Sequence, residues 1–151
     1  MKKIIIIVTA TILTATVAIA ATTCRMDEDR PINFNELPTV AQEFIRTHFA
    51  NSQVSHTLID RDITDTEYKV VLADGTKVEF NGSGQWREVD CRYTAVPEAI
   101  VPDAIEQYIA ANYPNSQIVE IKSGRNGWEA KITGGLELTF NNDMQLVDID
   151  D

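Results

Sequence analysis

The sequence has few of the residues on which most catalytic and metal-binding motifs depend. Its 151 residues include only two cysteines and two histidines. It has no HExxH helix motif, no zinc-type cysteine spacing and no glycine-rich phosphate loop. Neither His48 nor His56 has a recognisable nucleophile partner. These absences give no support to metal hydrolysis, nucleotide binding or covalent catalysis, and we expect the protein not to be an enzyme.

Basic residues are also scarce. The chain has 13 lysines and arginines against 23 aspartates and glutamates, a formal net charge of −10. Nucleic-acid binding needs a basic surface, and adhesion to anionic lipid needs basic residues too, so both kinds of partner are disfavoured. The charge permits binding of cations or of a basic protein partner. The alternative is that it only keeps a secreted protein soluble.

The N-terminus has the pattern of a secretory signal peptide. Lys2 and Lys3 precede an uncharged run over 4–20, which ends with the small residues Ala18 and Ala20 around Ile19. This pattern predicts export to the periplasm or the medium, removal of residues 1–20, and an acidic leader over 21–34. The alternative is a retained membrane anchor, because the run is only just long enough to span a bilayer. After cleavage we expect no membrane insertion.

The two cysteines leave further alternatives open. Cys24 lies just after the predicted signal and is a candidate lipid attachment site, although Thr23 stands where a Gly, Ala or Ser is expected. Export also makes a disulfide between Cys24 and Cys91 chemically possible. The spacing does not decide between a bridge and two free thiols, because disulfide formation depends on geometry.

Two similar stretches 64 residues apart, ANSQV at 50–54 and PNSQI at 114–118, indicate an internal duplication. Each follows an amphipathic helical pattern that opens at a proline, Pro38 or Pro102. We expect Asn51 and Asn115 to end these helices in the left-handed conformation, with Val54 and Ile118 buried at the start of the next strand. From Tyr68 against Trp128 onward the offset is 60, because the first copy has a longer hairpin loop, RDITDT, at 61–66.

Four strand-like segments follow each predicted helix. In the first copy they are QVSHTLID, EYKVVLA, TKVEFN and QWREVD, and in the second QIVEIK, GWEAKI, LELTFN and QLVDID. Turn pairs such as Asp74-Gly75 and Gly134-Gly135 separate them. The sequence predicts an α+β fold of two tandem repeats, 35–94 and 95–151, in one compact unit. Each repeat is one helix plus a four-stranded antiparallel meander, and the sheets adjoin with the helices on one face.

Alternation along the strands predicts which side chains face the helices. The expected core residues are Tyr68, Val70, Leu72, Val78, Phe80, Trp128, Ala130, Ile132, Leu138 and Phe140, with Val89 and Ile149 also inward. The opposite side is a ladder of charges that includes Glu67, Lys69, Lys77, Glu79, Glu129, Lys131 and Glu137.

A partner-binding site is predicted on this charged side. Strict alternation in the last strand of each copy puts Trp86 beside Glu88, and Leu146 beside Asp148, on the open face. Tryptophan is enriched at binding hot spots. The candidate contacts for an unknown protein or peptide are therefore Trp86, Lys69, Lys77, Glu79 and Glu88. The alternative is that a loop or the neighbouring repeat covers Trp86.

One acidic loop is a candidate metal site. Asp60, Asp62, Asp65 and Glu67 lie within eight residues in the longer hairpin of the first copy. Calcium takes six to eight oxygen ligands, many of them carboxylates, so these four residues are candidate calcium ligands. The segment lacks the central glycine and the distal glutamate of an EF-hand loop. The alternative is a solvated polar loop that binds nothing.

The order of these segments resembles the PepSY-like family, also described as beta-lactamase-inhibitor-like. The resemblance covers residues 30–151 and rests on DRP at 29–31, DC at 90–91 and the closing DIDD at 148–151. It implies periplasmic proteins with two helix-plus-four-strand modules whose sheets adjoin and curve. In beta-lactamase inhibitors of similar layout, the concave sheet surface binds a protein. No inhibitory loop of those proteins can be matched residue by residue to this sequence.

The resemblance gives no established activity, and our first hypothesis is a binding or regulatory module without catalytic activity, which presents its open sheet face around Trp86 to a protein or peptide in the periplasm. Family members are also loosely associated with calcium. A calcium-responsive periplasmic protein is therefore the alternative. The sequence leaves the partner and the oligomeric state open.

Overall fold

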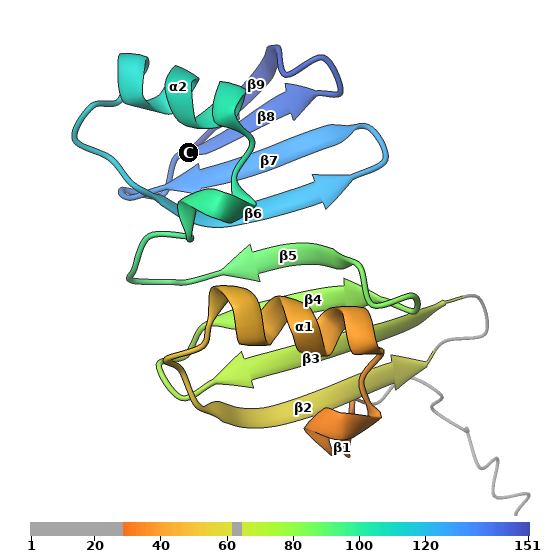
Figure 1. Cartoon of the computed structure of the whole chain (residues 1–151). Coiled ribbons are helices and arrows are strands. Elements are labelled where there is room, and N and C mark those ends of the chain that lie inside the picture. Colours follow the sequence, from red (N-terminus) through yellow and green to blue (C-terminus); the bar gives the residue numbers. More distant parts are fainter. Residues whose placement is uncertain (1–28, 62–64) are drawn as a thin grey trace, which may run out of the picture.

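The computed structural model describes residues 29–61 and 65–151 (Figure 1). The predicted signal peptide, Cys24, Asp62 and most of the predicted leader lie outside the described residues. Within the described ranges, no helix is both long and apolar enough to span a membrane.

The described residues form nine strands in one antiparallel sheet, whose order in space is the order in sequence. A short strand, β1 (Arg30–Ile32), comes first. The first repeat consists of a 3-10 turn (Phe34–Glu36), α1 (Thr39–His48), β2 (Val54–Arg61), β3 (Thr66–Leu72), β4 (Lys77–Asn81) and β5 (Trp86–Asp90). The second repeat consists of a 3-10 turn (Glu98–Ile100), α2 (Asp103–Asn112), β6 (Ile118–Gly124), β7 (Gly127–Ile132), β8 (Glu137–Asn141) and β9 (Leu146–Asp150).

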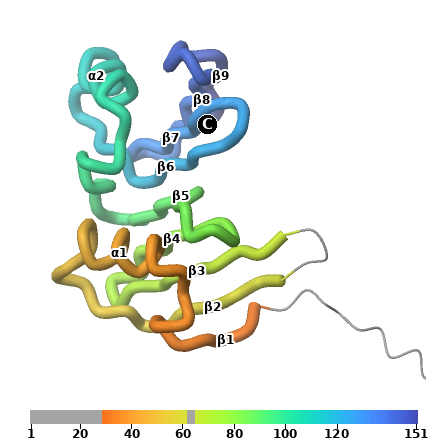
Figure 2. The backbone as a smooth tube through the Cα atoms, turned by 45° about the vertical axis from the view of Figure 1, so that its right-hand side comes forward, coloured from red at the N-terminus to blue at the C-terminus, as the bar shows by residue number. Residues whose placement is uncertain are grey.

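Both helices lie on the same side of the sheet, α1 over the strands of the first repeat and α2 over those of the second (Figures 1 and 2). The predicted α+β architecture is therefore confirmed. The two meanders are joined into one sheet because β5 pairs with β6, with Val89 opposite Ile121. β1 was not predicted: it pairs with β2, with Arg30 opposite Ile59 and Ile32 opposite Thr57. Three residues are too few for a period-two pattern to be visible.

The core lies between the helices and the sheet. Ala41 and Ile45 from α1, and Ile105 and Ile109 from α2, are buried against strand residues that are also buried: Val70, Leu72, Val78, Phe80, Val89, Ile121, Ala130, Ile132, Leu138 and Phe140. Burying each such aliphatic or aromatic side chain contributes about 1.5–3 kcal/mol. The predicted core set is confirmed, with Tyr68 and Trp128 half-buried and packed at its margin. Val89 is also buried, whereas Ile149 on the last strand is 44% exposed and lies outside the core.

The repeated NSQ segments link each helix to its first strand, as predicted, but two details differ. The helices end at His48 and Asn112, and the backbone N–H of Phe49 still donates to Ile45 at 2.9 Å. Positive φ among the described non-glycine residues occurs only at Arg92 and Met144, so the expected left-handed conformation of Asn51 and Asn115 is wrong. Each helix ends instead at an aromatic capping residue with negative φ, Phe49 at −129° and Tyr113 at −133°.

Val54 and Ile118 occupy equivalent positions but differ in burial. Ile118 is buried, as predicted, whereas Val54 is 36% exposed, so its predicted burial is wrong. The difference follows from their places in the sheet. The carbonyl of Ile118 accepts a bond from the Val96 N–H at 2.8 Å, which closes the sheet beside it. β1 covers β2 only from Thr57 to Ile59 and leaves Val54 open.

Candidate binding face

The side of the sheet away from the helices, here called the open face, is lined by rows of side chains that run across the strands. One row is Leu58, Lys69, Glu79, Glu88, Lys122, Glu129, Thr139 and Asp148, each opposite the next. The next row is His56, Val71, Lys77, Asp90, Glu120, Lys131, Glu137 and Asp150, and Asp60 opposite Glu67 begins a third. These positions carry ten carboxylates and only four lysines, so the open face is acidic.

Two of the four lysines are already held by carboxylates of this part of the molecule. The Lys69 amine lies 3.5 Å from both Asp29 and Glu79, and the Lys122 amine lies 2.8 Å from Glu120 and 3.8 Å from Glu88. The hydrogen bond that Lys122 donates to Glu120 raises the pKa of the Lys122 amine, against the effect of burial. Burial disfavours the charge of Lys69, but Glu79 and Asp29 outweigh it and raise the pKa of that amine. These lysines are therefore fully charged and paired at neutral pH.

The remaining carboxylates crowd one another. Burial raises the pKa of Glu88, and Glu79, Glu120 and Asp90 raise it further, although Lys122 opposes them. Burial also raises the pKa of Glu67, with Glu79 and Asp65 adding to the effect. A like charge nearby disfavours ionisation, so an added positive charge on this face would relieve part of the repulsion.

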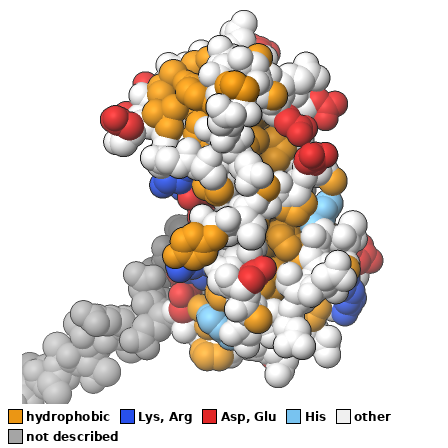
Figure 3. All heavy atoms as spheres, turned by 90° about the vertical axis from the view of Figure 1, so that its left-hand side faces the viewer, with side chains coloured by type: hydrophobic (Ala, Val, Ile, Leu, Met, Phe, Trp, Pro, Cys, Tyr) orange, Lys and Arg blue, Asp and Glu red, His pale blue; other side chains and the backbone are white. Residues whose placement is uncertain are grey.

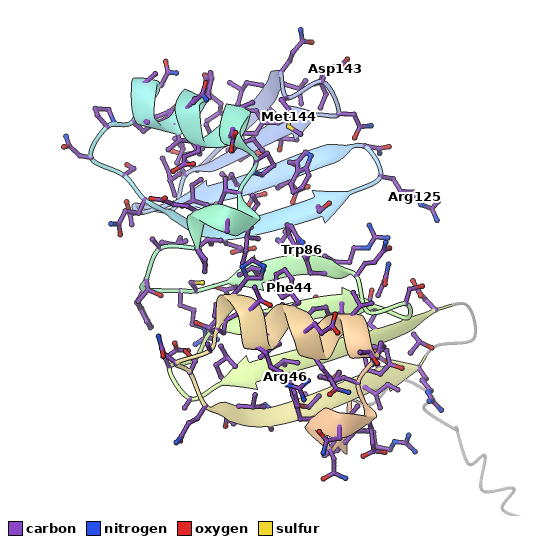
Figure 4. The ribbon with its side chains drawn as sticks, viewed as in Figure 1. Phe44, Arg46, Trp86, Arg125, Asp143 and Met144 are labelled. Carbon is purple, nitrogen blue, oxygen red and sulfur yellow. The ribbon has the colours of Figure 1, made fainter. Side chains whose placement is uncertain are left out.

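A depression of roughly 370 Å³ lies near the middle of the open face. It is lined by Glu79, Glu88, Lys122, Glu129 and, at its rim, Arg87 and Arg125. Arg125 projects from the turn between β6 and β7 (Figure 4). The depression can accept one side chain of a partner, and its charged lining consists of three glutamates and three basic residues.

The structure brings together Lys69, Glu79 and Glu88 on the open face, with Lys77 in the adjacent row, as predicted. The sequence prediction omitted Asp90, Glu120 and Lys122, which lie on the same face at the junction of the repeats. Alternation in QIVEIK marks Glu120 and Lys122 as outward-facing. Their closeness to Glu88 depends on the β5–β6 pairing, which a sequence pattern does not give.

The predicted placement of Trp86 on the open face is wrong. The register shifts by one residue between Glu79 and Phe80, so that Phe80 pairs with Trp86 while Glu79 pairs with Glu88. Arg87 is the extra residue of this β-bulge, and Trp86 turns to the helix side. Leu146 does the same beside Phe140, because an equivalent shift occurs there.

Trp86 packs between the two repeats on the helix side. Its ring centroid lies 6.0 Å from that of Phe44 on α1 and 5.8 Å from that of Trp128 on β7. Figure 4 shows Phe44 and Trp86 side by side at the edge of α1 that faces the second repeat. Beside them is an open groove of roughly 530 Å³, lined also by Val40 and Glu43. Trp86 therefore contacts both repeats. The alternative stated from the sequence, that the neighbouring repeat covers Trp86, is the one that the structure shows.

The candidate calcium ligands are only partly placed. Asp60 and Glu67 lie opposite each other on β2 and β3, and the Asp65 carboxylate accepts a bond from the Thr66 N–H at 2.8 Å. The buried Oδ1 of Asp60 has no hydrogen-bond partner among the described residues. Within 29–61 and 65–151, no group of three or more His, Cys, Asp or Glu side chains is arranged to hold a metal ion. Asp62 lies outside this part of the chain.

His48, His56 and Cys91 have surroundings that are typical of structural residues. The His48 ring lies 4.6 Å from the Phe44 ring, centroid to centroid, and His56 is exposed with Nδ1 3.3 Å from the Ser55 hydroxyl. Cys91 is a buried free thiol whose pKa is raised by burial. A buried, protonated thiol is a poor nucleophile.

The surface shows the same imbalance of charge as the sequence. In the view from the left of Figure 1, acidic side chains are more frequent than basic ones, and hydrophobic side chains gather over the upper half (Figure 3).

Comparisons with known proteins agree with this fold. A family profile described as "Putative beta-lactamase-inhibitor-like, PepSY-like" matches residues 66–148. No curated protein matches the chain. Three solved structures from Bacteroides are similar over nearly their whole length.

A "putative periplasmic protein" of the DUF2874 family from Bacteroides vulgatus is 42% identical, with a TM-score of 0.79 over 83% of this chain and 98% of the other. A "putative calcium-regulated periplasmic protein" from Bacteroides thetaiotaomicron is 39% identical, with a TM-score of 0.79 over 82% and 97%. A "putative periplasmic protein of unknown function" from Bacteroides vulgatus is 36% identical, with a TM-score of 0.78 over 82% and 100%. The chain, with its two helix-plus-four-strand repeats, therefore belongs to the PepSY-like, beta-lactamase-inhibitor-like family.

Proposed function

We propose that this protein is exported to the periplasm and binds a basic segment of a protein or peptide through the open face of its sheet, without catalysing a reaction. The observation that carries the proposal is the charge of the rows on that face: ten carboxylates against four lysines, with Lys69 and Lys122 already paired and Arg87 and Arg125 as further basic residues at the depression. A basic ligand side chain supplies the positive charge that the open face lacks.

The electrostatics favour such a ligand. At a separation of 4 Å and an effective dielectric constant of about 20, one ion pair contributes roughly 4 kcal/mol of Coulomb attraction before desolvation is subtracted. Glu88 is half-buried, and its raised pKa indicates that its present neighbours do not fully stabilise its charge. Charge complementarity of this kind speeds association and selects against acidic partners.

Peptide binding measured by calorimetry tests the proposal. The probes are an unstructured lysine-rich peptide, in which Lys alternates with Gly and Ser, and the same peptide with Glu in place of Lys. We expect only the lysine peptide to bind, with an affinity that falls as salt is added.

A pair of variants locates the binding. Glu88→Gln with Glu129→Gln removes two charges from the open face, whereas Glu43→Gln with Glu98→Gln removes two exposed charges from the helix side. We expect the first pair to weaken binding about tenfold and the second to leave it nearly unchanged. Equal loss in both pairs would show that net charge alone attracts the peptide, and the proposal would be wrong.

The second candidate function is a calcium response that uses Asp60, Asp62, Asp65 and Glu67. The unpartnered Oδ1 of Asp60 and the raised pKa of Glu67 favour it, because both indicate carboxylates that lack a counter-ion. One similar structure is described as a "putative calcium-regulated periplasmic protein". Lys69 neutralises the adjacent Asp29 and Glu79, so a cation would bind on the β2–β3 hairpin side of that lysine.

A further inference from the structure

The last strand of the sheet, β9, has an outer edge to which no strand among the described residues pairs. Its equivalent in the first repeat is β5, since Glu88, Val89 and Asp90 align with Asp148, Ile149 and Asp150 without a gap. The outer edge of β5 is covered: β6 pairs along it, with Lys122 opposite Glu88 and Ile121 opposite Val89. The same kind of edge is thus closed in one repeat and open in the other.

The burial of two equivalent residues measures the difference. Val89 on β5 is 0% exposed, whereas Ile149 on β9 is 44% exposed. Val147, the extra residue of the β9 bulge, is 59% exposed. An edge strand with two exposed aliphatic residues is a template for pairing with another strand.

The backbone of Ile149 points to the same conclusion. Its N–H donates at 3.0 Å to Oδ1 of Asp148, the neighbouring side chain. On β5 the equivalent N–H groups point toward β6. The N–H of Cys91 donates to the Val119 carbonyl at 2.8 Å, and the N–H of Val89, two residues earlier in the strand, points to the same side. The carboxylate of Asp148 therefore occupies the place of a strand carbonyl, and an incoming strand would take over that bond.

We infer that β9 receives an extended segment of a partner protein as a tenth, antiparallel strand, and that this segment alternates basic and apolar residues. The pairing of β5 with β6 gives two of the three positions: Lys122 lies opposite Glu88 and Ile121 opposite Val89, so a Lys or Arg lies opposite Asp148 and an aliphatic residue opposite Ile149. In the first repeat Asp90 faces Glu120, so a second Lys or Arg opposite Asp150 follows from charge complementarity alone. The inference depends on the proposed function only for the basic character of the partner, because it places the contact on the edge and on backbone hydrogen bonds.

Two other occupants are disfavoured by the structure. Pairing of β9 with β9 of a second copy brings Asp148 and Asp150 of both copies together, and like charges across strands are destabilising. Head-to-tail pairing of β9 with the opposite edge strand, β1, of another copy would form few ladder bonds, because β1 has three residues and Pro31 has no N–H to donate.

A labelled peptide tests the inference. The probe is residues 116–124 of this chain, the β6 segment, with the substitution E120K, which places lysines opposite Asp148 and Asp150. Fluorescence anisotropy with the protein lacking residues 1–20 should show saturable binding. A peptide N-methylated at Ile121 loses the N–H that faces β9 and should bind about tenfold more weakly or worse, since a ladder bond is lost.

Variants of the protein locate the strand. Ile149→Pro removes the outward N–H and keeps an apolar edge residue, which an edge strand tolerates. Thermal melting confirms that it folds, and we expect it to lose binding. Asp148→Lys with Asp150→Lys should also lose binding, and a peptide carrying K122E with the natural Glu120 should restore it. Asp143→Lys, on the turn before β9, is the matched charge control and should bind the probe normally.

Three outcomes would overturn the inference. Equal binding of the N-methylated peptide would mean that charge alone holds the ligand, which leaves the proposed function standing and removes the strand. Full binding by Ile149→Pro would move the site away from β9. Self-association of the protein that Ile149→Pro abolishes, without any binding of the probe, would make a second copy the occupant.

Discussion

Trp86 and Trp128 lie in different repeats, and their ring centroids are 5.8 Å apart at an interplanar angle of 53°. Together with Phe44 they form an aromatic contact between α1, β5 and β7. Tilted aromatic pairs at this distance are favourable beyond the area they bury. This contact adds side-chain packing to the backbone pairing of β5 with β6, so the two repeats are joined on the helix side as well as within the sheet.

Truncation of Trp86 should therefore destabilise the protein more than truncation of its repeat equivalent. We expect Trp86→Ala to lower the free energy of unfolding by about 3 kcal/mol and Leu146→Ala by about 1–2 kcal/mol, because Leu146 has no further repeat to contact. Urea denaturation of both variants checks this. Equal losses would mean that Trp86 contributes only through its own repeat.

The two strand-start residues should respond differently to charge. Ile118→Asp places a carboxylate in a buried site and should cost about 3 kcal/mol or more, whereas Val54→Asp at the open end of β2 should cost about 1 kcal/mol or less. Thermal and urea unfolding of both variants provides the measurement. A severe loss for Val54→Asp would show that β2 is covered at this end.

The crowded carboxylates predict a pH dependence of stability. Folding raises the pKa of Glu88, so the folded state binds more protons than the unfolded state just above the ordinary carboxyl range. The free energy of unfolding should therefore fall as pH rises from the ordinary pKa to the raised one. Glu88→Gln has no such titration, so its stability relative to the natural protein should rise across this window. Urea titrations at a series of pH values test this, and a constant difference between the two proteins would contradict it.

Calcium should raise the melting temperature if the acidic hairpin binds it, because a ligand that binds only the folded state stabilises that state. We expect a concentration-dependent shift in differential scanning calorimetry, lost in Asp60→Asn combined with Glu67→Gln. Magnesium at equal concentration is the control for simple screening. An unchanged melt in millimolar calcium would remove the second candidate function.

Export predicts a shortened mature protein. Mass spectrometry of the protein from its native envelope should show loss of 20 or 21 residues and an unmodified Cys24. A mass that retains Met1 would indicate an anchor, and an added lipid mass would indicate a lipoprotein.

The fold could be predicted because the duplication presents each helix pattern and each strand pattern twice, in the same order along the chain. The parity of residues such as Val70 and Phe80 identified the buried face directly. The bulges could not be predicted, because one extra residue in a strand changes the side chain's face without changing the composition. Trp86 shows the effect: strict alternation places it with Glu88, and the single extra residue Arg87 turns it to the helices.

The candidate site was only partly predictable for a related reason. Lys69 and Glu79 face each other across one hairpin, where the turn fixes the register. Lys122 meets Glu88 across the junction of the repeats, where a long connection intervenes and no turn determines the alignment. The three-residue strand β1 carries too short a pattern to distinguish it from an extended leader.

The order of the nine strands along the sheet has a consequence for how the chain folds. Every described strand after β1 pairs with the one that precedes it in the chain, so none of these strands waits for a later segment before its first partner is available. A chain that becomes available with its N-terminus first can lengthen the sheet one strand at a time, with α1 covering the strands of the first repeat before α2 is available. Such sequential neighbour pairing keeps loop closure short except across the connections that contain α1 and α2. It also limits the time for which an unpaired strand edge is exposed to other unfolded chains.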